Sequence, residues 1–375
     1  MTATRTPAGL PRARALGIPL DGAPGQHNAI TDVPGVQVGY TTLVEGESVR
    51  TGVTAILPRG RDGVADPCAA GWCSLNGNGE MTGTAWVEET GSLALPIGIT
   101  NTHAIGTVHR GLIDWVVRNR PELAREWLLP VVGETWDGYL NDINGAHVRT
   151  THAAAAVDAA RSGPVEEGSV GGGTGMNCYA FKGGSGTASR VVEHGADRYA
   201  VGAFVQANFG ARRELVVAGV PVGKQLLADN PMEESDWLAR PGAGSVIVVV
   251  GTDAPLLPGQ CTALARRVPM GLARTGTTGS HFSGDLFLAF STANRGALTS
   301  TMAPGGPDYE QLRFVPWGRM DPFYEAVVQA TEEAVLNAQT ANADMTGRDG
   351  HRTPALPHDH LTNLLRNSGL RLVDR

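Results

Sequence analysis

The sequence predicts a layered α/β fold, in which helices cover the faces of β-sheets. Short apolar runs typical of strands alternate along the chain with segments that have helical periodicity. Several of the predicted strands are apolar on both faces, which is typical of strands buried between two layers. With 375 residues, of which 42% are hydrophobic, the chain is long enough to bury a large core.

Composition and charge argue against several functional classes. The chain has 30 Lys and Arg residues against 37 Asp and Glu residues, and its net charge of −7 does not favour a general nucleic-acid-binding surface. No segment approaches the roughly 18 continuous apolar residues of a membrane span, and the basic N-terminus lacks a signal-peptide core. We therefore expect a cytoplasmic protein. None of the four cysteines forms a C-x-x-C pair, which favours reduced thiols over a zinc site.

The first quarter of the chain begins with an irregular segment. Proline, arginine and glycine interrupt every apolar pattern in residues 1–25, which predicts a loose N-terminal arm. A single domain is predicted over residues 26–375, because no clear linker divides them. Apolar runs predict strands over 53–57 and 95–100, and the polar segment 74–80 between them predicts a turn.

Helical signals follow these strands. Apolar residues at helical spacing predict a helix over 105–117, and Pro121 stands where a second, short helix would begin. An alanine-rich segment predicts a helix over 153–160. The glycine-rich stretch 168–190 lacks the G-x-x-x-x-G-K-[ST] motif, so tight turns are favoured over a nucleotide site. A strand is predicted over 199–207.

The last part of the chain begins with a connecting segment over 220–243, rich in proline and acidic residues. The remaining predicted elements are a strand over 246–250, helices over 256–273 and 322–341, a strand over 286–291 and a short helix over 361–365. In the helix over 322–341, the pattern places Glu332 and Glu333 on the solvent face.

A glycine and a serine stand directly before the most apolar of these strands. Gly244 and Ser245 precede five β-branched residues at 246–250. If the Ser245 hydroxyl attacked the Gly244 carbonyl, the chain would cut itself, and Ser245 would gain a free α-amine. An α-amine has a pKa of about 7.7–8.0 and can act as a base beside a nucleophilic hydroxyl. The alternative is that Ser245 merely begins a core strand.

Polar residues near other predicted strands are further candidates. Ser283 and Asp285 share a face of an extended segment and can form a proton relay, or else belong to an ordinary polar turn. Glu134 lies among aromatic residues and can bind an ammonium group, or else is a solvated acid. Asn208 ends a predicted strand, where its amide can stabilise an oxyanion or serve a turn.

Metal binding is not favoured by the sequence. His351, His358 and His360 lie in a polar, proline-rich stretch without an acidic neighbourhood that would order them as ligands. We expect neither a metal nor a cofactor.

Several motifs follow one another along the chain in an order that resembles a known family. They are HNAITDV (27–33), TGVTAILP (51–58), LNGNGEMTG (75–83), GGTGM (172–176), FKGGSGTAS (181–189), GS (244–245), TDAPLLP (252–258) and SGD (283–285). With these motifs the chain resembles the L-aminopeptidase D-amidase/D-esterases and β-peptidyl aminopeptidases, from about residue 28 to residue 345.

The resemblance implies a fold and a maturation step. Members of the family have an αββα sandwich, similar to N-terminal nucleophile (Ntn) hydrolases but differently connected. They are made as one precursor that cleaves itself, here between Gly244 and Ser245, into chains 1–244 and 245–375. They assemble as tetramers of αβ units, act without a metal, and release N-terminal residues from peptides, amides and esters.

The resemblance also implies roles for individual residues. Ser245 would be the nucleophile, with Ser283 and Asp285 as its relay. The remaining implied roles are oxyanion stabilisation by Asn208, ammonium binding by Glu134, and support of the tetrahedral intermediate by Tyr139. Two alternatives stay open: an acyltransferase like the ornithine acetyltransferases, and an inactive relative that serves as a binding or scaffold protein.

Overall fold

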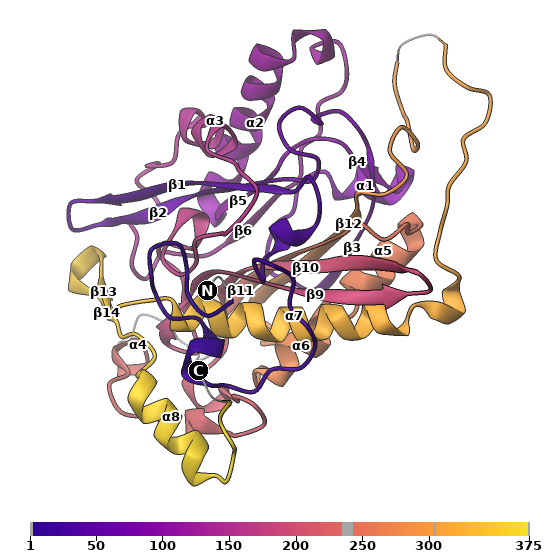
Figure 1. The fold of residues 1–375 in the computed structure, drawn as a ribbon. Helices are drawn as coiled ribbons and strands as arrows, with labels where there is room; N and C mark the ends of the chain where they lie inside the picture. Colours follow the sequence, from indigo (N-terminus) through magenta and orange to yellow (C-terminus); the bar gives the residue numbers. More distant parts are fainter. Residues whose placement is uncertain (1–2, 235–242, 303–304, 374–375) are drawn as a thin grey trace.

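Two β-sheets form the centre of the protein (Figure 1). The computed structural model describes residues 3–234, 243–302 and 305–373. Within these ranges, one sheet has the order β1-β2-β5-β6, with bounds Gln37–Glu45, Val49–Leu57, Ile97–Asn101 and Val132–Thr135. The other has the order β4-β3-β12-β11-β10-β9, with bounds Ser92–Leu93, Cys68–Gly77, Ser283–Ser291, Gly244–Thr252, Asp197–Asn208 and Gly184–His194.

Helices cover the outer face of each sheet. Helices α2 (Ile105–Asn119) and α3 (Thr150–Asp158) pack on the sheet that contains β1 and β2. Helices α5 (Pro258–Ala265), α6 (Val268–Arg274) and α7 (Asp321–Thr340) lie over the sheet that contains β11 (Figure 1). The four layers are therefore helices, sheet, sheet and helices, and the predicted αββα architecture is confirmed.

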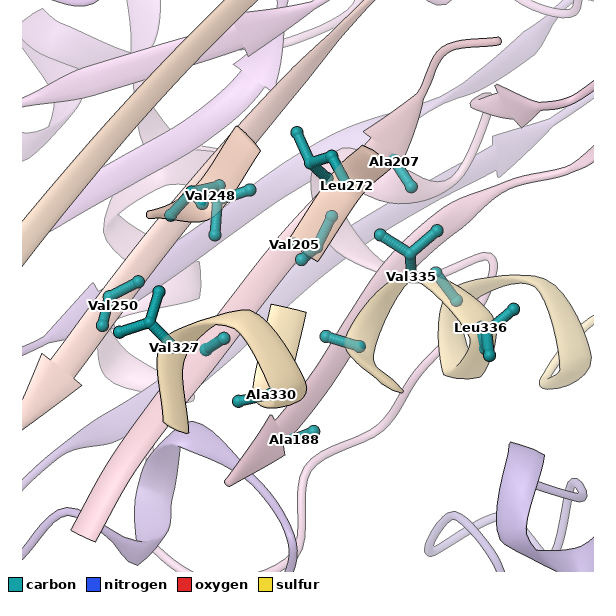
Figure 2. Packing of buried hydrophobic residues seen from close by; sticks show 14 of the residues in the cluster. Ala188, Val205, Ala207, Val248, Val250, Leu272, Val327, Ala330, Val335 and Leu336 are labelled. Atoms are coloured by element: carbon teal, nitrogen blue, oxygen red, sulfur yellow. The ribbon is translucent and has the colours of Figure 1, made fainter. Parts of the chain in front are cut away.

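Strand β11 shows how the layers are held together. Val248 and Val250 belong to the apolar cluster beneath α6 and α7, which also contains Leu272 and Val327 (Figure 2). Ile247 and Val249 point the other way, into the apolar layer between the two sheets. Because successive side chains of a strand alternate between faces, a β-branched run fills both cores at once.

The remaining short elements border these layers. They are α1 (Thr84–Thr90), β7 (Asn177–Cys178), β8 (Phe181–Lys182), α4 (Pro231–Glu234), β13 (Met345–Thr346), β14 (Arg352–Thr353) and α8 (His358–Asn367). None of the helices in the described ranges is long and apolar enough to cross a membrane. Of the predicted connecting segment 220–243, residues 235–242 lie outside the described residues.

The glycine-rich sequence concealed the beginning of a long strand. The stretch 168–190 was predicted as turns, but strand β9 begins within it at Gly184. A Cβ atom at Gly186 would lie 2.0 Å from the carbonyl oxygen of Ala334, so glycine is needed here for α7 to approach the sheet. The predicted turn at 74–80 was also partly wrong, because residues 74–77 complete strand β3. The helix predicted over 256–273 is divided into α5 and α6, with Pro269 in the first turn of α6.

Charged residues are buried at two places where the sequence predicted exposure. Glu333 of α7 is fully buried, and its carboxylate is neutralised by Arg14 and Arg190, each at 2.8 Å. Arg12 is 2% exposed and pairs with buried Glu167 at 2.6 Å. The prediction of a loose arm over residues 1–25 therefore does not hold around Arg12 and Arg14, which neutralise carboxylates inside the fold.

Candidate active site

Ser245 lies near the start of strand β11, in the sheet that faces β6. Its side chain is buried, with 2% of the residue exposed. It pairs with Asn208 across the antiparallel β10 and with Gly284 across the parallel β12. A Cβ atom at Gly244 would lie 2.0 Å from the carbonyl oxygen of Asn208, so only glycine fits directly before this serine. The sheet thus fixes the Gly244–Ser245 peptide from both sides.

A serine and a carboxylate lie beside this peptide on strand β12. The register places Ser283 next to Gly244, and the Ser283 hydroxyl donates a hydrogen bond of 2.5 Å to Asp285 Oδ1. Asn76 Nδ2 donates to the other carboxylate oxygen at 2.9 Å. Burial raises the pKa of Asp285 above its ordinary value, which makes this carboxylate a stronger base than one in water. The arrangement can hold and accept a proton next to Ser245.

The backbone of Trp136 connects Ser245 with Asn208. Trp136 N–H donates to Ser245 Oγ at 3.0 Å, and Asn208 Nδ2 donates to Trp136 O at 2.9 Å. The Asn208 Oδ1 atom accepts from Asn177 N–H at 2.9 Å, which fixes which side of the amide carries the donors. Sequence reasoning missed Trp136, since its contacts here are made by the main chain, which has no residue-specific signal.

Glu134 lies on strand β6, two residues before Trp136. It is 2% exposed, and its carboxylate accepts hydrogen bonds from Glu80 N–H at 2.9 Å and from the Thr102 hydroxyl. Burial is the main cause that raises the pKa of Glu134 above its ordinary value. A cationic ligand would offset this cost of desolvation, so the position favours binding of an ammonium group.

Tyr139 is buried next to the C-terminal part of the chain. Its ring stacks on His351, with ring centroids 4.6 Å apart, and its hydroxyl donates to the Arg352 carbonyl at 3.4 Å. His351 Nδ1 lies 2.9 Å from the Tyr139 carbonyl oxygen. These contacts give His351 a packing role, and the part of Tyr139 in the reaction stays a prediction.

No metal site was found in the parts of the chain that the structure describes, where no group of three or more His, Cys, Asp or Glu side chains is placed to hold an ion. The chemistry available around Ser245 is that of hydroxyl, amide and carboxylate groups. Such a set is suited to acyl transfer through a covalent intermediate.

Comparison with known proteins decides the family. The model of peptidase family S58 matches residues 28–353. The chain belongs to peptidase family S58. It is 48% identical over 372 residues to a β-peptidyl aminopeptidase of Sphingosinicella microcystinivorans, a match that covers 95% of this chain and 92% of the relative.

Solved structures agree with this assignment. The L-aminopeptidase D-Ala-esterase/amidase of Ochrobactrum anthropi, described as a variant of the Ntn-hydrolase fold, matches with a TM-score of 0.90 and 45% identity, covering 96% of this chain and 99% of that one. A β-aminopeptidase from Burkholderia sp. matches with a TM-score of 0.87 and 46% identity, covering 96% and 99%. The predicted class, a hydrolase of the serine aminopeptidase group with an Ntn-type fold, is confirmed, and the acyltransferase and scaffold alternatives are not favoured.

Proposed function

We propose that this peptidase cleaves itself between Gly244 and Ser245 and then uses Ser245 to remove N-terminal residues from peptides, amides and esters. The observation that carries the proposal is the buried Ser245 hydroxyl, held at 3.0 Å by Trp136 N–H at the start of a strand whose neighbour carries the Ser283–Asp285 pair. The relatives at 44% and 48% identity are β-peptidyl aminopeptidases, which makes N-terminal β-amino acids the first substrates to test.

Maturation follows from the position of the Ser245 hydroxyl. Its Oγ attacks the Gly244 carbonyl carbon, the bond from that carbon to the Ser245 nitrogen breaks, the hydroxyl proton passes to that nitrogen, and an ester forms. Water then hydrolyses the ester and leaves a Gly244 carboxylate and a free Ser245 α-amine. The products are chains 1–244 and 245–375 of the single domain predicted for this protein.

Turnover then repeats the same chemistry on a substrate. The Ser245 α-amine takes the hydroxyl proton while Oγ attacks the substrate carbonyl, and it returns a proton to the leaving amine. Asn208 Nδ2 donates to the oxyanion, Ser283 and Asp285 hold the α-amine in place, and Glu134 binds the substrate ammonium. Tyr139 supports this site from the side of the C-terminal segment. Water releases the acyl group.

The test is the Ser245→Ala variant, with Ser162→Ala, an exposed serine outside the site, as its control. Intact mass under denaturing conditions should show two fragments for the wild type and the control, and one uncut chain without hydrolysis for Ser245→Ala. Release of p-nitroaniline from β-alanyl, L-alanyl and D-alanyl anilides then ranks the substrates. An active, uncut Ser245→Ala protein contradicts the proposal.

The proposal extends to assembly and location. We expect a homotetramer of αβ units in the cytoplasm, acting on small substrates with a free amine and not on nucleic acids or membranes. Light scattering of the processed protein measures the assembly, and a mass of one αβ unit would contradict it.

A further inference from the structure

Lys182 is a buried lysine close to the proposed oxyanion donor. It lies on strand β8 with 0% of its surface exposed, and burial lowers its pKa to about 7. Its Nζ atom donates to the carbonyl oxygens of Met176 at 2.6 Å and Gly183 at 2.9 Å. Asp137 is the acidic group that acts on it by charge, since burial raises the pKa of the neighbouring Cys178 thiol and keeps it neutral. A buried ammonium group is costly, so a lysine here needs a reason beyond filling space.

The hairpin of β7 and β8 explains how Lys182 reaches Met176. Asn177 and Lys182 are paired residues across this hairpin, and its turn places Tyr179 and Ala180 at positive φ angles of 54° and 55°. The ammonium group therefore folds back to the carbonyl that precedes Asn177. The Met176 carbonyl and the Asn177 N–H are the two ends of one planar peptide unit.

The N–H of that peptide unit is hydrogen-bonded to the side chain of Asn208. The Asn177 N–H donates to Asn208 Oδ1 at 2.9 Å, and Asn208 Nδ2 donates to Trp136 O at 2.9 Å. A hydrogen-bond donor at a peptide oxygen, whether a neutral amine or an ammonium group, increases the positive charge on the same peptide's N–H, and an ammonium group does so more strongly. This N–H then bonds more strongly to Oδ1, which in turn makes the Nδ2–H groups better donors.

We propose that Lys182 is a positioning residue for Asn208, which orients and polarises the oxyanion-binding amide through the Met176–Asn177 peptide. This inference rests on the proposed function, in which Asn208 binds the oxyanion. Lys182 touches neither substrate nor Ser245 in this account. Its effect on the reaction passes through one side chain, and this separates it from a lysine that only stabilises the hairpin.

A double-mutant cycle tests whether Lys182 acts on the reaction through Asn208. Lys182→Met removes the charge at similar length, and Lys182→Gln keeps N–H donors without the charge. Each is made alone and with Asn208→Ala, and kcat and KM are measured for hydrolysis of β-alanyl-p-nitroanilide. Rates are expressed per processed chain, counted by intact mass, so incomplete maturation does not alter them. If Lys182→Met does not fold, Lys182→Gln completes the same cycle.

Loss of one oxyanion donor costs about 10²–10³ in kcat, and we expect Lys182→Met to cost about tenfold with little change in KM. In the Asn208→Ala background the same substitution should change kcat by less than about twofold, because the amide through which Lys182 acts is already absent. Lys182→Gln should lie between Lys182→Met and the wild type.

Three results overturn the inference. A tenfold loss that persists in the Asn208→Ala background, or an unchanged kcat for Lys182→Met, refutes the route through Asn208 and leaves the proposed function intact. An unchanged kcat for Asn208→Ala alone refutes the oxyanion assignment of Asn208, and with it the route from Lys182, while the role of Ser245 is tested separately by Ser245→Ala.

Discussion

Replacing Gly244 by alanine tests whether the close contact between β11 and β10 controls self-cleavage. The new Cβ atom would lie 2.0 Å from Asn208 O and 3.0 Å from both the Asn208 carbonyl carbon and Phe209 Cα, all of them backbone atoms. Reaching even a tight contact of 3.0 Å from Asn208 O requires a shift of 1.0 Å (3.0 − 2.0) at the scissile peptide. Misplacement of reacting atoms by about 1 Å costs roughly 10²-fold in rate, so we expect self-cleavage to slow about 100-fold.

The assay is a time course of intact mass after rapid purification in the cold. Gly318→Ala is the matched control, because a Cβ atom there meets no atom within 4 Å. The melting temperature of each uncut precursor shows whether the fold survives. Cleavage of Gly244→Ala at the wild-type rate, with an unchanged melting temperature, would refute the steric argument.

Three further predictions concern turnover. Asp285→Asn should lower kcat about 100-fold in progress curves with little effect on KM, as expected when the α-amine that acts as the base is no longer held in place; a raised KM with an unchanged kcat would argue against this role. Glu134→Gln should raise KM about tenfold for substrates with a free amine and leave acetylated ester substrates unaffected, without lowering the melting temperature, since a desolvated charge is removed. The Ser245 α-amine must be unprotonated to act as a base, so kcat/KM should fall as the pH drops below about 7.7–8.0; a flat profile down to pH 6 would exclude it.

A second effect on pH dependence comes from Glu134. Burial raises its pKa above the ordinary 4.5, so its charged form is lost at a higher pH than that of a free glutamate. The ammonium site should therefore weaken as the pH falls through this raised pKa, which is seen as a rise in KM. The Glu134→Gln variant should lack this rise.

The sequence predicted the strands near Ser245 well, because apolar β-branched runs leave little choice of structure. The run 246–250 lies inside β11, and Asn208 and Ser283 stand at the ends of strands as expected. Strand β9 was missed because its glycines are needed where other backbone comes close, Gly186 against α7 and Gly184 against Gly168, which is a property of the tertiary structure. Local composition carries no information on which helix will pack there.

The sequence predicted those members of the candidate site that act through their side chains. It did not predict the member that acts through its backbone. Ser245, Glu134 and the Ser283–Asp285 pair were identified by residue type. Trp136 was not, since any residue offers the same N–H group. Glu333 was placed on the surface because its arginine partners are more than 140 residues away in the sequence, at positions 14 and 190.

The proposed cut divides one sheet between two polypeptides. Strands β11 and β12 would belong to the second chain, while β10 and β3, which flank them, would remain in the first. Buried Glu333 of the second chain would likewise be held by arginines of the first. A single precursor can refold by itself. After the cut, the two separate chains would have to associate, and the second chain would have to insert β11 and β12 together between β10 and β3. The lifetime of the cut protein would then be governed by the rate of opening, and denaturation of the mature enzyme would be practically irreversible.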